Sequence, residues 1–394
     1  MLVHNSFLKI KRYNFLLLFI LLSPGIHIFG SRYGIRLEQL IVLGFMFTIF
    51  PILLFKYPKL FTKELMILMS FLFYLPISLI INTNVVESIG PILGFTRFIG
   101  FGIIGYLIVS KGIHYEKFLQ FVFYVGLIYL IISYLQHYNI LNIGNFFFTY
   151  YNGSGHGQLH NYLKMPTTTF GIAEFTARFL VFSYIFAFLL YRKTKFFKSY
   201  KLLFLIGLFM FMFSESRGTF VAVLYISFIL FFTENKKFTF YGSIILLLIS
   251  IILIFLFYQY LISSDASIDK NILYRLEHTW LKPLVDASSS WVTIIYGMGL
   301  QEPYGDGSFT ARFGQSGILG FLAFYFPILY VLVKIKNIKE NDFYLNVFFF
   351  STITLLVSNV TYQSFDTGKI ADIYWLILGA TLKYLYLKRN NSVI

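Results

Sequence analysis

Long apolar runs recur along most of the chain, and they limit what it can fold into more than any other feature. Runs such as residues 38–55, 89–109 and 238–261 are each long enough, as a helix, to cross the ~30 Å hydrocarbon core of a membrane. Hydrophobic residues make up 58% of the 394 residues and charged residues only 12%, well below the charge of a soluble domain. The sequence therefore predicts an all-α, polytopic membrane protein.

We expect about twelve transmembrane helices in a single transmembrane domain over residues 1–394. The first apolar run lacks a small-residue cleavage site and is followed by many more, so we interpret it as a span and not as a removed signal peptide. Small residues in the fourth span, Gly100, Gly102 and Gly105, predict close contact with another helix. The expected spans are 13–30, 38–55, 64–81, 89–109, 117–138, 170–190, 201–215, 217–233, 238–261, 313–333, 343–360 and 371–387.

Positive charge is unevenly distributed between alternate connections. Short, lysine-rich stretches such as "KYPKLFTKE" and "YRKTKFFKSYK" alternate with connections that carry fewer cations. The positive-inside rule places the lysine-rich set, and with it both chain termini, in the cytoplasm. The same rule explains the net charge of +15, so no nucleic-acid partner is expected.

Arginine follows the opposite distribution from lysine. The cytoplasmic connections contain three arginines and eighteen lysines, whereas the outer connections contain four lysines and seven arginines: Arg32, Arg36, Arg97, Arg178, Arg217, Arg275 and Arg312. The planar fork of guanidinium donors matches the oxygens of phosphate and carboxylate groups in pairs. We infer that the outer face handles an anion, a phosphate group above all. The alternative is that these arginines pair with outer carboxylates or with lipid headgroups.

The stretch "SESRG" divides one long apolar run into two spans. A charge inside a bilayer is costly, so Arg217 is expected where the chain reverses or where an aqueous cavity enters. Glu215 and Arg217 are two residues apart and cannot face each other across a helix. Two interpretations remain open: ionic groups that point into a shared cavity, or a tight hairpin with an arginine at the membrane interface.

Two outer connections, residues 139–170 and 262–312, are much longer than the others, and long loops in compact proteins are usually functional or disordered. In "YRLEHTW", Arg275 and His278 share a face if the segment is helical, and could bind an anion and move a proton. An amphipathic helix on the membrane surface is the alternative. In "GDGSFTAR", Asp306 is a candidate base toward a sugar hydroxyl or a turn aspartate, and Arg312 stands at the entrance to a span.

Several further polar residues have weaker patterns. Glu174 and Arg178 are spaced as a helical pair near the outer end of their span, where they are structural or line a cavity. His156 and His160 lie among glycines without an evident third ligand, so a surface loop is preferred and no metal is expected. The stretch "GQSGILG" predicts a close-packing helix face. No nucleotide-binding motif is present in the sequence, and no cofactor is expected.

Four stretches in order resemble the O-antigen polymerase and O-antigen ligase superfamily. They are "SESRGTF", an outer loop with Arg275 and Trp280 in an R-x-x-x-x-W pattern, "YGMGL", and "GILGFLAFY". The similarity covers mainly residues 170–330. The resemblance implies a GT-C-like membrane fold and transfer of a glycan from undecaprenyl pyrophosphate to a hydroxyl at the periplasmic face. The implied partners are the undecaprenyl-pyrophosphate-linked oligosaccharide, membrane lipids, and a chain-length regulator and a flippase of the same pathway. The implied location is the inner (cytoplasmic) membrane of a bacterium.

Site residues follow from this resemblance and from position. The resemblance assigns Arg217 and Arg275 to the pyrophosphate, where charge develops as the bond breaks. Asp306 and His278 are expected to act in catalysis, and the residues expected to contact substrate are Arg97, Arg178, Arg312, Glu174 and Trp280.

One departure from the family pattern separates a polymerase from a ligase. Where the ligases carry a loop histidine, this sequence has "GDGSFTAR". That difference favours a polymerase of O-antigen or capsule repeat units over a ligase that transfers finished glycan to lipid A core. A flippase for lipid-linked oligosaccharide is the third hypothesis.

Overall fold

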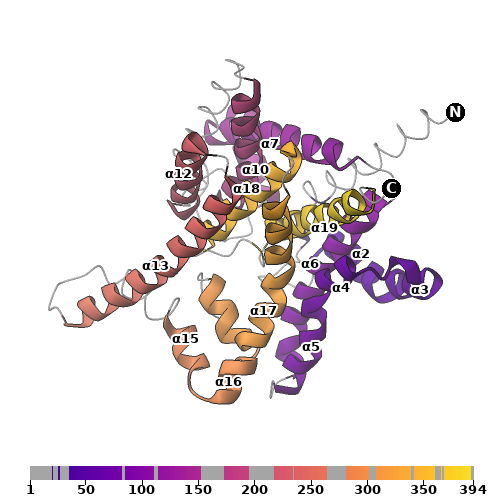
Figure 1. The fold of residues 1–394 in the computed structure, drawn as a ribbon, viewed down its shortest axis with the longest axis vertical. Coiled ribbons are helices and arrows are strands. Elements are labelled where there is room, and N and C mark those ends of the chain that lie inside the picture. Colours follow the sequence, from indigo (N-terminus) through magenta and orange to yellow (C-terminus); the bar gives the residue numbers. More distant parts are fainter. Residues whose placement is uncertain are drawn as a thin grey trace.

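The computed structural model describes residues 20, 25–26, 35–81, 85–110, 114–151, 173–194, 217–233, 235–263, 281–300, 308–338, 341–359, 365 and 368–391. Nearly all of this part of the chain is helical, as predicted (Figure 1). The elements are β1 (Gly25–Ile26), β2 (Ile35–Arg36), α2 (Leu37–Gly44), η2 (Phe45–Ile49), α3 (Phe50–Lys56), η3 (Pro58–Leu60), α4 (Lys63–Leu68), α5 (Ser70–Ile81), α6 (Val85–Ser110), α7 (Tyr115–His137), η4 (Ile140–Asn142), α8 (Ile143–Tyr151), α10 (Ala173–Thr194), α12 (Arg217–Phe232), α13 (Lys236–Ser263), α15 (Lys282–Ala287), α16 (Trp291–Tyr296), α17 (Ser308–Asn337), α18 (Phe343–Ser358) and α19 (Gly368–Asn391).

Six helical segments of the described residues are long and apolar enough to cross a membrane. They are Glu38–Lys56, Lys63–Ile81, Ile89–Val109, Tyr115–His137, Phe309–Asn337 and Lys369–Asn390. The total of twelve spans stays a prediction, since the range 201–215 lies outside the described residues and 13–30 lies largely outside them. One expected boundary is wrong. The first span cannot continue as a helix to residue 30, because β1 pairs with β2 as an antiparallel ladder.

Helices α6 and α19 pack closely against each other through glycine. A side-chain carbon at Gly105 would lie 2.9 Å from the carbonyl carbon of Leu376 and 3.1 Å from the nitrogen of Ala380. A carbon at Gly379 would collide with the backbone of Gly102. The predicted close contact at Gly102 and Gly105 is therefore confirmed, and its partner is α19.

Lysine side chains mark one end of the helical bundle, which we call the lysine end. Asp342 precedes α18 and accepts hydrogen bonds from Lys388 Nζ at 3.0 Å and Tyr384 Oη at 2.9 Å, both in the last turns of α19. Lys236, at the start of α13, donates to the carbonyl oxygen of Ile338 at 3.1 Å, directly after α17. The start of α13, the end of α17, the start of α18 and the end of α19 are therefore close to one another at this end of the bundle.

Candidate functional site

Buried cations occupy the opposite parts of the helices that meet at the lysine end. Arg178, Lys369 and Arg312 lie within the first two turns of α10, α19 and α17, and are 0%, 1% and 4% exposed. Arg97 lies in the middle of α6, and 13% of its side-chain surface is exposed. Burial of a guanidinium or ammonium group is costly unless anionic or dipolar groups compensate it. We call this region the arginine end, and it is the candidate site.

Arg312 is held by aromatic rings and by its own helix. Its guanidinium carbon lies 4.2 Å from the ring centroid of Phe95 on α6 and 5.2 Å from that of Phe324 on α17. Nη1 donates a hydrogen bond to Gln315 Oε1 at 2.9 Å. Aromatic faces attract a guanidinium strongly when water is excluded, so the rings fix its position. Arg312 was expected at the entrance to a span, and it lies buried within the first two turns of α17.

Helix α17 is broken shortly after Arg312, at Gly317, where φ is 58° and ψ is −166°. The carbonyl oxygens of Gly314 and Gln315, before the break, accept hydrogen bonds from the backbone nitrogens of Met298 at 2.8 Å and Gly299 at 3.0 Å. Such a break needs partners from the protein because lipid offers none. The close packing predicted for "GQSGILG" is confirmed, but the helix is interrupted there. The "GMGL" stretch packs against the interruption and donates hydrogen bonds to its carbonyl oxygens.

Helix α5 supports α16 and α17 through two hydroxyl groups. Pro327 lacks a backbone N–H and so leaves the carbonyl oxygen of Ala323 without its helical donor. Ser70 Oγ donates to that oxygen at 2.6 Å, and Tyr74 Oη donates to the carbonyl oxygen of Tyr296 at 2.6 Å. Figure 1 shows α16 beside the end of α17 that carries the break. The helices around the break are therefore fixed by specific polar contacts within an apolar interior.

Arg97 and Asp372 form an ion pair between α6 and α19. Arg97 Nε lies 2.9 Å from Asp372 Oδ1, and the Asp372 side chain is 0% exposed. The guanidinium carbon of Arg97 also lies 4.4 Å from the ring centroid of Phe98. Arg97 lies within α6, inside the expected span 89–109, and not in the connection before it. Asp372 was not predicted as a site residue, although its "KIAD" stretch opens an apolar run where a charge is unusual.

Glu174 and Arg178 both belong to α10, as their spacing predicts. Arg178 is fully buried. The next residue, Phe179, packs edge-on against Tyr129 of α7, with ring centroids 5.6 Å apart. Arg178 therefore belongs to the packed interior near the start of α10.

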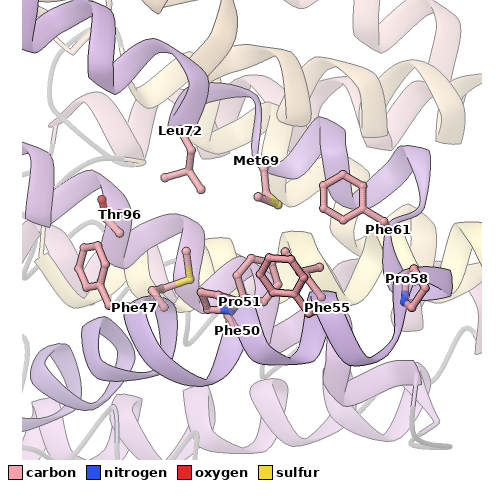
Figure 2. Close-up of a pocket in the computed structure, with 11 residues that line it drawn as sticks. Phe47, Phe50, Pro51, Phe55, Pro58, Phe61, Met69, Leu72 and Thr96 are labelled. Atoms are coloured by element: carbon pink, nitrogen blue, oxygen red, sulfur yellow. The ribbon is translucent and has the colours of Figure 1, made fainter.

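An apolar groove of about 570 Å³ lies between the η2–α3 segment and α5 (Figure 2). Phe47, Phe50 and Phe55 line one wall, and Leu72 lies on the other (Figure 2). Thr96 of α6 also lines the groove, and its hydroxyl donates to the backbone carbonyl one turn earlier at 2.9 Å. Thr96 directly precedes Arg97, so the groove reaches the turn of α6 that carries Arg97.

The remaining predicted site residues are not placed as a group. Arg217 is the first residue of α12, which agrees with the predicted start of that span. Arg275, His278, Trp280 and Asp306 lie outside the described residues, so their roles stay predictions. Within the described ranges, no group of three or more histidine, aspartate or glutamate side chains is arranged to hold a metal ion.

Comparisons with known proteins give no assignment for this chain. No protein-family model, no curated protein and no solved structure matches it. The functional conclusion therefore depends on the residues and their geometry.

Proposed function

We propose that the chain is a repeat-unit polymerase for a bacterial surface polysaccharide in the inner membrane. A sugar hydroxyl of one lipid-linked unit attacks the anomeric carbon of the glycan carried by undecaprenyl pyrophosphate. The bond between this carbon and the pyrophosphate oxygen breaks, and undecaprenyl pyrophosphate leaves with the electron pair. The hydroxyl proton passes to a base, and a new glycosidic bond joins glycan and acceptor. The GT-C-like arrangement that the resemblance implies belongs to the same proposal.

The observation that carries the proposal is the burial of several arginines toward the end of the bundle that lies opposite the lysine end. Lysine and tyrosine side chains bind Asp342 at the lysine end. At the arginine end Arg178, Arg312 and Lys369 are buried, and the Arg97 side chain is 13% exposed. Positive-inside orientation requires charge at one end only and is indifferent to the kind of cation. Buried arginines toward the other end supply fixed donors for a leaving diphosphate in a region of low dielectric constant. By this reasoning the lysine end faces the cytoplasm.

The apolar groove supports the proposal of a lipid-linked substrate. A polyprenyl chain is apolar along its whole length and ends in a diphosphate. The groove offers an apolar wall, and it meets α6 at Thr96, beside Arg97. In the proposal the polyprenyl chain lies in this groove and its diphosphate lies at the arginine end.

The test is made in the native host with Arg312→Lys, Arg217→Ala and Arg275→Ala. A lysine keeps the charge of Arg312 but loses the fork and the flat face that packs on Phe95. We expect a loss of long polymer of about tenfold or more at unchanged protein level, which corresponds to about 1.4 kcal/mol of transition-state stabilisation. Lys388→Arg at the lysine end is the matched control and should leave polymer normal. Long polymer in all three arginine variants would refute the proposal.

The form of the product separates the polymerase from a ligase. A polymerase deletion leaves one capped repeat unit on the lipid A core, whereas a ligase deletion leaves none. A wild-type ladder after deletion of the whole chain excludes both functions.

A flippase for the same lipid-linked unit is the second candidate, and the break in α17 favours it. Transporters use discontinuous helices to build binding sites within the membrane, and Gly317 interrupts an apolar helix of this kind. Purified protein in vesicles decides between the two. Movement of labelled lipid-linked unit across the bilayer, without chain extension, would replace the polymerase by the flippase.

A further inference from the structure

The Arg97–Asp372 ion pair uses only a small part of the binding capacity of its arginine. A guanidinium has five N–H donors, and Asp372 takes the Nε donor. Among the described residues, Arg97 Nη1 and Nη2 have no hydrogen-bond partner, and the side chain keeps 13% of its surface. The other group against the guanidinium is the ring of Phe98. Four donors of a largely buried arginine are therefore available to a ligand.

The Asp342–Lys388 ion pair at the lysine end is built differently. Asp342 also accepts from the backbone nitrogens of Tyr344 and Leu345, both at 3.1 Å, so it caps α18. The Lys388 side chain is 30% exposed and that of Asp342 is 10% exposed. That pair stabilises a helix start and joins two helices. Asp372, in contrast, lies inside α19 beyond its first turn, and its side chain is fully buried.

The surroundings keep the Arg97 guanidinium in one place. Asp372 is on α19 and Arg97 is on α6, and these helices are locked together by the Gly105–Leu376 contact, two turns further along α6. A fork that is ordered before binding loses little conformational entropy when an oxyanion arrives. Asp372 would therefore act on a ligand through Arg97 without touching the ligand.

We propose that Asp372 is a positioning residue that holds Arg97 by Nε so that Nη1 and Nη2 bind a phosphate oxyanion. The inference rests on the proposed function for its ligand class, a diphosphate on a polyprenyl lipid. Free pyrophosphate carries the same oxyanion, so the probes must separate the two sources. Lysine at position 97 would present a single ammonium group, which Asp372 would itself engage.

The experiment uses the full chain in detergent micelles and isothermal titration calorimetry. The probes are farnesyl pyrophosphate, inorganic pyrophosphate and farnesol. We expect wild-type protein to bind farnesyl pyrophosphate and not farnesol. Arg97→Lys and Asp372→Asn should each weaken binding about ten- to a hundredfold, as loss of charge-assisted hydrogen bonds does. Asp342→Asn, at the lysine end, is the matched control and should leave the affinity unchanged.

A double variant separates positioning from simple structural support. If Asp372 acts through Arg97, the Arg97→Lys/Asp372→Asn protein binds no more weakly than either single variant. Additive losses, or unchanged affinity in Arg97→Lys, overturn the proposal. Should Asp372→Asn fail to fold, Asp372→Glu, which keeps the carboxylate but moves it by one methylene group, takes its place in the comparison. If inorganic pyrophosphate and farnesyl pyrophosphate bind with equal affinity, Arg97 still belongs to an anion site, but the ligand of this site is the free ion and not a lipid.

The binding measurements and the polymer phenotype can fail separately. A deletion strain with normal polymer refutes the proposed function even if Arg97 binds diphosphate. Conversely, normal diphosphate affinity in Arg97→Lys refutes the positioning role of Asp372 even if polymer is lost in the deletion strain.

Discussion

The glycine contact between α6 and α19 predicts opposite effects for the same substitution at two positions of one helix. In Gly105→Ala the new methyl group would lie 2.9 Å from the Leu376 carbonyl carbon and 3.1 Å from the Ala380 nitrogen, both backbone atoms of α19. Neither atom can rotate away, so the helices must separate. A gap of about 0.5–1 Å forfeits a quarter to a half of the dispersion energy of each flanking atom pair.

The expected magnitude follows from two opposing contributions. Overpacking of a tight interior costs about 1–3 kcal/mol. Alanine recovers up to about 1 kcal/mol through its better helix propensity. We therefore expect Gly105→Ala to lower the free energy of unfolding by about 1–2 kcal/mol.

Gly94, on the same helix, is the matched control. A side-chain carbon there would meet no atom within 4 Å, so Gly94→Ala should be neutral or stabilising by up to about 1 kcal/mol. The assay is unfolding of purified protein in mixed micelles by increasing sodium dodecyl sulfate, followed by far-ultraviolet circular dichroism. The reasoning fails if both alanine variants shift the unfolding midpoint in the same direction by a similar amount.

Three further predictions concern the break, the lysine end and the orientation. Gly317→Ala should sharply reduce folded protein in fluorescence-detected size exclusion, because φ is 58° and the added carbon would lie 2.5 Å from backbone of α16. Burial raises the pKa of Asp342, but hydrogen bonds from the α18 backbone and from the Lys388 and Tyr384 side chains together lower it by more. The resulting pKa therefore lies below the ordinary value of 3.8. The lowered pKa stabilises the folded protein above the unfolded-state pKa of about 4, and this stabilisation is lost as the pH falls through the folded-state pKa. Asp342→Asn has no carboxyl group to titrate, so this loss should be absent when its unfolding is followed in acid. The chain has no cysteine, so a single introduced cysteine can be labelled selectively. In the proposed orientation Trp291→Cys reacts with an impermeant maleimide on intact spheroplasts, whereas Lys237→Cys reacts only after permeabilisation. The opposite result would invert the proposed orientation.

The helical class and most helix positions could be predicted because both are local properties. A run such as residues 89–109 needs only its own composition to indicate a span, and its glycines indicate a packing face. The partner of that face could not be predicted. Gly105 meets Leu376 through a pairing of helices far apart in the chain, and apolar side chains on every span are compatible with many such pairings.

The same limit explains what was missed at the site. The pairing of Arg97 with Asp372 could not be predicted, because the two residues are far apart in the chain. Each is tolerated inside the bundle because the other lies 2.9 Å away, which only the fold shows. The break at Gly317 was missed for a different reason, since glycine is common in continuous membrane helices as well as at interruptions.

The contact between α6 and α19 also has a consequence for how the protein is made. During synthesis, residues near position 100 leave the ribosome long before those near position 375, and α6 must wait in the membrane with an arginine and a glycine face uncovered. Only when α19 inserts does Asp372 arrive to neutralise Arg97. A chain that stops before residue 368 therefore lacks the carboxylate that pairs with Arg97, and the charge of this arginine stays uncompensated.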